Sequence, residues 1–105
     1  MNKASIAAWT LATLAWAPLA QAADPAEDLL QKSGCTTCHG IDKKIVGPAY
    51  KDVAAKYKGD KAAEARLIEK VKKGGTGAWG QVPMPPNPQV KDEDIATMVR
   101  FILKL

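Results

Sequence analysis

The residues of this sequence whose types and spacing could do chemistry are concentrated in one short segment. Cys35, Cys38 and His39 form the pattern C-x-x-C-H, and His39 is the only histidine of the chain. Two thiols three positions apart on a helical turn can each add to one vinyl group of the same porphyrin, and the adjacent imidazole can then bind its iron. This spacing is the attachment signal for c-type haem. The segment therefore predicts one covalent haem c, with thioether bonds to Cys35 and Cys38 and with His39 as an axial ligand.

Three other kinds of site could use the same segment. A disulfide oxidoreductase places C-x-x-C at a helix N-terminus after a strand, whereas here the motif follows a predicted helix. A zinc site would need a fourth ligand from a carboxylate or water, and the adjacency of Cys38 and His39 would strain it. A structural disulfide between the two cysteines is the third alternative. We favour haem over all three, and two cysteines exclude a scaffold held by several disulfides.

The second axial position decides what such a haem does. An open position binds small molecules, whereas two protein ligands favour electron transfer, so a peroxidase-like or gas-binding protein is the alternative to an electron carrier. Without a second histidine, the remaining ligand is Met, Lys or none. Met98 falls on the apolar face of a predicted helix and is expected in the core. Met84 lies among prolines in VPMPPN, and we expect this rigid loop to present its thioether to the iron.

This choice of ligands has a functional consequence. His/Met coordination raises the reduction potential of a haem, and a closed six-coordinate iron changes little between its oxidation states. The sequence therefore predicts a single-electron carrier, not an enzyme, that works by outer-sphere transfer through an exposed haem edge.

The N-terminal segment differs from the rest of the chain. After Lys3, residues 6–20 are almost entirely apolar or small, a stretch shorter than the roughly 20 residues of a membrane-spanning helix. Ala20-Gln21-Ala22 supplies a small-x-small cleavage site. We predict that residues 1–22 are a cleaved secretory signal and that residues 23–105 are an exported monohaem domain without stable membrane insertion. A retained N-terminal anchor is the alternative.

Length and composition indicate one small globular domain. The 105 residues include 15 Lys and Arg against 11 Asp and Glu, which gives a formal charge of +4. Hydrophobic residues make up 47% and charged residues 25%, the composition of a folded domain. Because so short a chain has a small core, it commonly needs a disulfide, metal or large cofactor, and haem would meet this need.

The pattern of apolar residues and helix breakers predicts an all-α fold of four helices. The first begins at Pro25, with Asp24 as its cap, and ends near Gly34. The next two span residues 49–57 and 62–73. Asp92 is expected to cap the last, whose apolar stripe is Ile95, Met98, Val99, Ile102 and Leu103. Residues 74–90 hold many Gly and Pro and are expected to form a long loop, since no stretch alternates long enough for a strand.

Six segments carry a family resemblance that covers essentially the whole chain after residue 22. They are GCTTCH from Gly34, VGPAY from Val46, DVAAKY from Asp52, KKGG from Lys72, GAWG from Gly77 and VPMPPN from Val82. With them the chain resembles the small bacterial class I cytochromes c of the cytochrome c-551/c-552 type. The resemblance implies a compact fold wrapped around one haem and a role as a periplasmic electron shuttle.

The resemblance also implies roles for residues around the haem. The carbonyl of Pro48 would accept a hydrogen bond from the proximal imidazole, a contact that tunes ligand basicity. Trp79 would donate its indole N–H to a haem propionate, and Asn87 would hydrogen-bond near the Met sulfur. Lys70 stands where many relatives carry an Arg paired with a propionate, so a point charge replaces a bidentate fork.

Lysines make the middle of the chain basic: Lys43, Lys44, Lys51, Lys56, Lys58, Lys61, Lys70, Lys72 and Lys73. Nucleic acid is not the expected partner, because a secreted chain meets none and no aromatic residues interleave with the basic ones. Most of these lysines are expected to solvate helix faces, and some to steer docking to acidic redox proteins. By resemblance, acceptors include a nitrite reductase, a terminal oxidase and a cytochrome c peroxidase. We expect a monomer.

Overall fold

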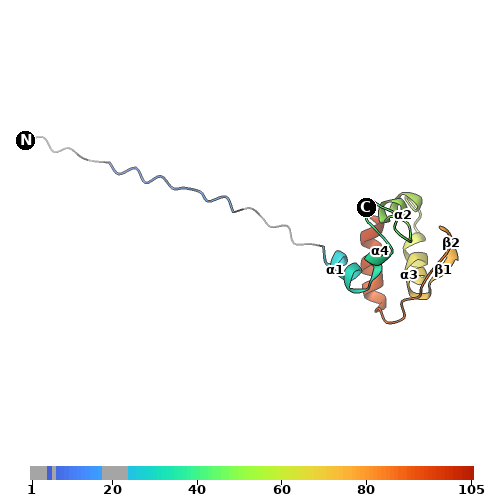
Figure 1. Cartoon of the computed structure of the whole chain (residues 1–105). Coiled ribbons are helices and arrows are strands. Elements are labelled where there is room, and N and C mark those ends of the chain that lie inside the picture. The colour runs from blue at the N-terminus through green and yellow to red at the C-terminus, as the bar shows by residue number, and fades with distance from the viewer. Residues whose placement is uncertain (1–4, 6, 18–23) are drawn as a thin grey trace, which may run out of the picture.

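The computed structural model describes residue 5, residues 7–17 and residues 24–105. Its elements are α1 (Pro25–Lys32), a 3-10 turn η1 (Cys35–Thr37), α2 (Tyr50–Lys56), α3 (Ala63–Lys73), β1 (Gly75–Gly77), β2 (Gly80–Met84) and α4 (Asp92–Leu103). Helix α4 lies at the centre and contacts α1, α2 and α3 (Figure 1). The four predicted helices are thus confirmed.

The described part of the N-terminal segment is separate from the helices. Residues 7–17 form neither helix nor strand and are exposed. Within the residues that the structure describes, no helix is long and apolar enough to cross a membrane. The predicted cleavage site at Ala20-Gln21-Ala22 lies outside the described residues, so the secretory signal over 1–22 stays a prediction.

Helix α1 begins and ends for local reasons. The carboxylate of Asp24 accepts a hydrogen bond from the N–H of Ala26 at 2.9 Å, and Pro25 takes the first helical position. This confirms the predicted cap, which satisfies one of the free N–H groups at the helix start. At the other end Gly34 has φ of 77°, a left-handed conformation that glycine adopts without a Cβ penalty. The chain therefore turns directly from α1 into η1, which carries Cys35.

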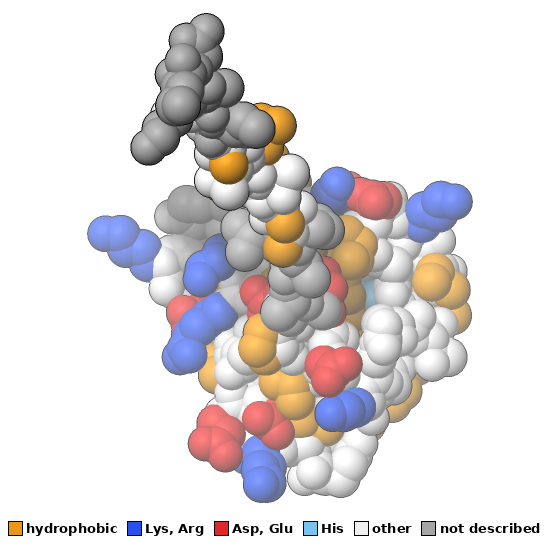
Figure 2. All heavy atoms as spheres, turned by 90° about the vertical axis from the view of Figure 1, so that its left-hand side faces the viewer, with side chains coloured by type: hydrophobic (Ala, Val, Ile, Leu, Met, Phe, Trp, Pro, Cys, Tyr) orange, Lys and Arg blue, Asp and Glu red, His pale blue; other side chains and the backbone are white. Residues whose placement is uncertain are grey.

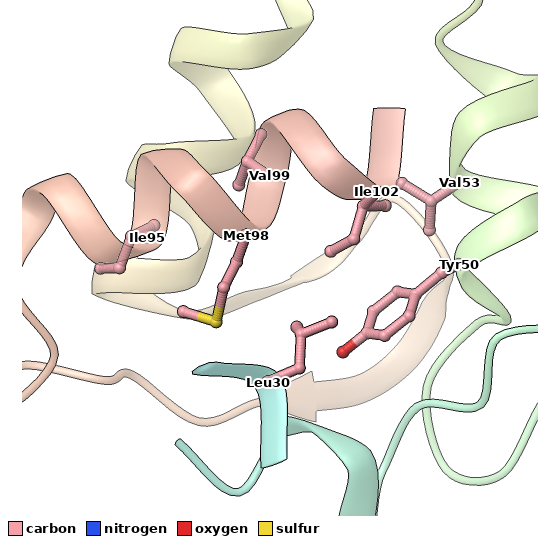
Figure 3. Packing of buried hydrophobic residues seen from close by; sticks show 7 residues of the cluster. All are labelled: Leu30, Tyr50, Val53, Ile95, Met98, Val99 and Ile102. Atoms are coloured by element: carbon pink, nitrogen blue, oxygen red, sulfur yellow. The ribbon is translucent and has the colours of Figure 1, made fainter. Parts of the chain in front are cut away.

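The core forms where α4 crosses the other helices. Ile95, Met98, Val99 and Ile102 of α4 are buried, whereas Leu103 is only half-buried. They pack with Leu30 of α1 and with Tyr50 and Val53 of α2 (Figure 3). The spacing i, i+3, i+4, i+7 places these side chains on one helix face. Met98 is 2% exposed, so its assignment to the core is confirmed.

The prediction that Asp92 caps α4 is wrong. The cap position belongs to Lys91, and Asp92 is the first residue of the helix. The Asp92 carboxylate instead accepts a hydrogen bond from Lys72 Nζ at 2.6 Å. An acidic group in the first turn still favours the positive end of the helix dipole, but here it also ties the start of α4 to the last turn of α3.

The all-α assignment missed a small sheet inside the expected loop of residues 74–90. Strands β1 and β2 pair antiparallel, with Gly75 opposite Met84 and Gly77 opposite Gly80. Gly77 and Gly80 have φ of 107° and 109°, values that L side chains rarely adopt. Because the strands are short and mostly exposed, their sequence lacks the alternation of apolar and polar residues that would predict them. They are held by backbone bonds, and glycine supplies the tight turn.

Truncation of the best-buried side chain of α4 should destabilise the domain without touching the site described below. Ile95 is 0% exposed. We expect Ile95→Ala to lower the free energy of unfolding by about 2–5 kcal/mol, because transfer and cavity costs add. Urea titration of the haem-loaded protein measures this. The control Glu93→Ala, on the exposed side of the same helix, should cost less than about 1 kcal/mol, and equal losses would contradict the core assignment.

Candidate functional site

Helix α1 and its glycine turn deliver the C-x-x-C-H segment. Directly after η1, the N–H groups of Cys38 and His39 both donate to the carbonyl of Cys35, at 3.2 and 3.0 Å. The thiols of Cys35 and Cys38 are free and half-buried. Both side chains line the same cavity as His39. The tight turn therefore presents two thiols and an imidazole to one volume, as the motif predicts.

The imidazole of His39 is held on three sides. Its Nδ1 lies 2.8 Å from the carbonyl oxygen of Pro48, and because a carbonyl only accepts, Nδ1 carries the proton. The ring stacks on Tyr50, with centroids 5.1 Å apart and planes inclined by 16°. At Gly47 a Cβ would lie 2.5 Å from Cε1 of the ring. This arrangement leaves the Nε2 lone pair for a metal, with Pro48 as the outer partner that sets the tautomer.

The cavity that receives these groups measures about 450 Å³. All four helices and both strands contribute to its wall, and most of the side chains that line it are hydrophobic. Contributors far apart in sequence include Leu30, Tyr50, Leu67, Trp79, Met84 and Met98. Concave and largely apolar sites with a few convergent polar groups are typical of cofactor binding.

Met84 reaches the cavity from the hairpin. It is the last residue of β2, it is half-buried, and it pairs with Gly75 of β1. Gly74 permits this close approach, because a Cβ there would lie 2.4 Å from the carbonyl oxygen of Met84. The segment VPMPPN therefore does place Met84 at the cavity, although from a strand end and not from an irregular loop.

Asn87 anchors the base of this hairpin to α3. Its backbone N–H donates to Lys72 O at 3.1 Å, and its side-chain amide donates to the carbonyls of Val71 at 3.0 Å and Pro85 at 3.3 Å. The implied contact with the Met sulfur stays a prediction. The observed bonds give Asn87 a definite structural role, since they hold the chain beyond Met84 against the last turn of α3.

Trp79 and Lys70 border the cavity on the hairpin side. Trp79 lies in the turn between β1 and β2, lines the cavity and is 42% exposed. Lys70 of α3 also lines it, and its Nζ approaches Gly75 so closely that a Cβ there would lie 2.8 Å away. An indole N–H and an ammonium can both bind a carboxylate, so their placement suits the propionate contacts that stay predicted for them.

The environment of Cys35 differs from that of the reactive thiol in a disulfide oxidoreductase. Burial raises the pKa of the Cys35 thiol, and the neighbouring Cys38 adds to the shift. Reactive disulfide oxidoreductases instead depend on a lowered thiol pKa. Among the described residues, no group of three or more His, Cys, Asp or Glu side chains is arranged to hold a metal ion. The raised pKa of Cys35 therefore gives no support to the thiol-exchange alternative.

The residues present fit a covalent haem. Two free thiols lie three positions apart, an imidazole keeps one nitrogen free, and Met84 lines the same apolar cavity from another element. The sequence patterns assigned no role at the site to Gly47 or Lys56, although Gly47 leaves room for the His39 ring and Lys56 contacts Trp79. The glycine directly before Pro48 was a signal for a close approach, whereas Lys56 offered none.

A methyl group at position 47 should displace the imidazole. Because the Cβ would overlap the ring of His39, we expect Gly47→Ala to lengthen or break the Nδ1–Pro48 bond and to cost about 1–3 kcal/mol of stability. The Nδ1–H resonance and urea unfolding of the haem-loaded protein measure the two effects. Ile45→Ala, at a side chain that is 54% exposed and lies outside the cavity lining, is the control. An unchanged resonance in Gly47→Ala would refute the contact.

Comparison with known proteins agrees with this site. The family model for cytochrome c matches residues 23–105. Cytochrome c-551 of Allochromatium vinosum is 64% identical over 77 residues, which cover 73% of this chain and 82% of that protein. Cytochrome c-551 of Pseudomonas aeruginosa is 50% identical over 93 residues, which cover 89% and 83%.

A solved structure agrees as well. The crystal structure of Nitrosomonas europaea cytochrome c552 superposes with a TM-score of 0.73 at 47% identity, over 75% of this chain and 98% of that one. The four helices therefore form a class I cytochrome c fold, to which the hairpin adds a small sheet. Its cofactor is one covalent haem c, as in the cytochrome c family. The family model covers most of the sequence, and the chain belongs to the cytochrome c family.

Proposed function

We propose that this protein is a periplasmic single-electron carrier whose haem iron is bound by His39 and Met84. One observation carries the proposal. Cys35, Cys38 and His39 line a single, mostly apolar cavity, and Met84 of the hairpin lines the same cavity. When bound, the haem supplies an iron that gains and loses one electron. The resemblance to cytochromes named c-551 and c-552 supports electron transfer as the role, and an enzymatic one is not proposed.

The residues around His39 and Met84 would favour electron transfer by holding both side chains in fixed positions. The Pro48 carbonyl and the Tyr50 ring hold the imidazole of His39 in one orientation. The close approach to Gly74 and the bonds of Asn87 hold the backbone beside Met84. A site whose ligands are held before the electron arrives needs little rearrangement, and the surrounding hydrophobic side chains keep water away.

The electron would enter and leave at the surface that borders the cavity, by contact with a redox protein. Nitrite reductase, a terminal oxidase and a cytochrome c peroxidase remain the acceptors that we propose by resemblance. The predicted signal over residues 1–22 supports a periplasmic location, and we propose that the mature protein is a monomer.

Several lysines of the basic middle are locally neutralised. Lys51 pairs with Asp42, Lys72 with Asp92 and Lys73 with Glu69. Figure 2 shows a face on which basic and acidic side chains are intermingled, with hydrophobic side chains between them. Lys44, by contrast, is exposed and lines the cavity. Its charge is therefore placed to act on a partner that approaches there, which favours a local steering charge over the net charge.

Removal of the Met84 thioether should open the iron. We expect Met84→Ala to lose the weak red charge-transfer band of sulfur on ferric iron and to bind carbon monoxide once reduced, whereas the wild type should not. Optical spectra of the periplasmic protein measure both properties. Met98→Leu is the matched control, because Met98 is the other methionine of residues 23–105. This variant should keep the band. Ready binding of carbon monoxide by the wild type would favour the ligand-binding alternative instead.

Steering by Lys44 should appear as a dependence on ionic strength. We expect Lys44→Gln to slow electron exchange with an acidic redox protein about two- to threefold at low salt, and the difference to fade as salt screens the charges. Stopped-flow mixing measures the rates. Lys104→Gln makes the same change of charge at a lysine outside the cavity lining and should leave the rate nearly unchanged. A rate that does not vary with salt would exclude steering.

A further inference from the structure

Lys56 makes two contacts with the turn of the hairpin. It is the last residue of α2, and its Nζ donates a hydrogen bond to the carbonyl of Ala78 at 2.8 Å. The same ammonium lies 4.5 Å from the centroid of the Trp79 ring. A cation over an indole face is attracted by the ring quadrupole. One side chain thus fixes both the backbone and the aromatic ring at the tip of the hairpin, 22 residues further along the chain.

The hairpin needs such a contact because it has few others. Strands β1 and β2 contact each other closely, whereas their backbone contacts with the helices are sparse. Most of their residues are exposed. The base of the hairpin is tied to α3 through Asn87. The tip, with Ala78 and Trp79, has Lys56 of α2 as its polar tie.

We propose that Lys56 is a positioning residue that keeps the hairpin closed over the cavity and thereby keeps Met84 in place. Met84 ends the strand that begins one residue after Trp79, so a displacement of the tip is passed along β2 to the thioether. The proposal rests on the proposed function, in which Met84 binds the iron. It assigns to one lysine of the basic middle a role within the protein, separate from partner docking.

The contact is exposed, and its effect should be moderate. A charge-assisted hydrogen bond together with a cation–π contact at a surface contributes enough to change an opening equilibrium several-fold to about tenfold. That change is small against the total stability, so a variant of this exposed side chain should still fold. The effect should appear in local opening of the hairpin, the kind of fluctuation that hydrogen exchange detects.

Imidazole, used as a small ligand that must displace Met84 from ferric iron, tests the proposal. We expect Lys56→Met in the haem-loaded protein to bind imidazole about three- to tenfold more tightly than the wild type, because the hairpin opens more often. Amide exchange at Gly77 and Gly80 should accelerate by a similar factor. Lys56→Arg, which keeps the cation and the donor, should restore both properties.

The matched control is Lys58→Met, which removes one positive charge two residues away at a side chain that makes no hydrogen bond or ion pair with the part of the chain that the structure describes. It should behave as the wild type. Equal imidazole affinity and equal exchange in Lys56→Met and Lys58→Met would overturn the role of Lys56. A wild type without the sulfur band of Met84 would instead overturn the proposed function, so the two failures are distinguishable.

Discussion

The hydrogen bond between His39 Nδ1 and the Pro48 carbonyl is the contact on which the rest of the site depends. It assigns the proton to Nδ1 and leaves Nε2 free. Because Pro48 follows His39 by nine positions, the chain between them must fold back to the ring. That return is built from backbone bonds. The N–H groups of Val46 and Gly47 donate to Cys38 O, and the N–H of Tyr50 donates to Gly40 O, which starts α2 beside the ring. The proximal segment and the second helix are therefore one unit.

The two sides of the cavity are stabilised in different ways. On the proximal side, backbone hydrogen bonds and the buried ring of Tyr50 join His39 to the core that α4 organises. On the distal side, Met84 ends a short hairpin that is mostly exposed and is tied to the helices by Asn87 and Lys56. Local stability follows buried contacts, so the distal side is the part of the site most open to adjustment.

The surface charges are arranged locally. The formal charge of +4 includes residues 1–22, and much of the remaining charge is held in pairs such as Arg100 with Glu64 between α4 and α3. Exposed pairs of this kind contribute little to stability. They do decide which lysines are left to act on a partner or, for Lys56, on the protein itself. Net charge alone is therefore a poor guide to docking for this chain.

The sequence by itself determined the covalent haem and the helices. Cys35, Cys38 and His39 lie within five consecutive residues, so their spacing indicates their joint use. The apolar stripe of α4 follows from the helical period. The placement of Met84 among prolines also identified it as a candidate ligand. These features are local, and local patterns survive into the fold because short-range geometry produces them.

Only the tertiary structure decided the contacts between distant segments. The hairpin of residues 75–84 has no alternating pattern, since glycine conformations and backbone pairing hold it. The link of Asp92 to Lys72, the bond of Lys56 to Ala78 and the fit of Gly47 against His39 join residues through space. No periodicity encodes such pairs. They depend on how α4 sets the other helices around the cavity, and that is settled only when the whole chain packs.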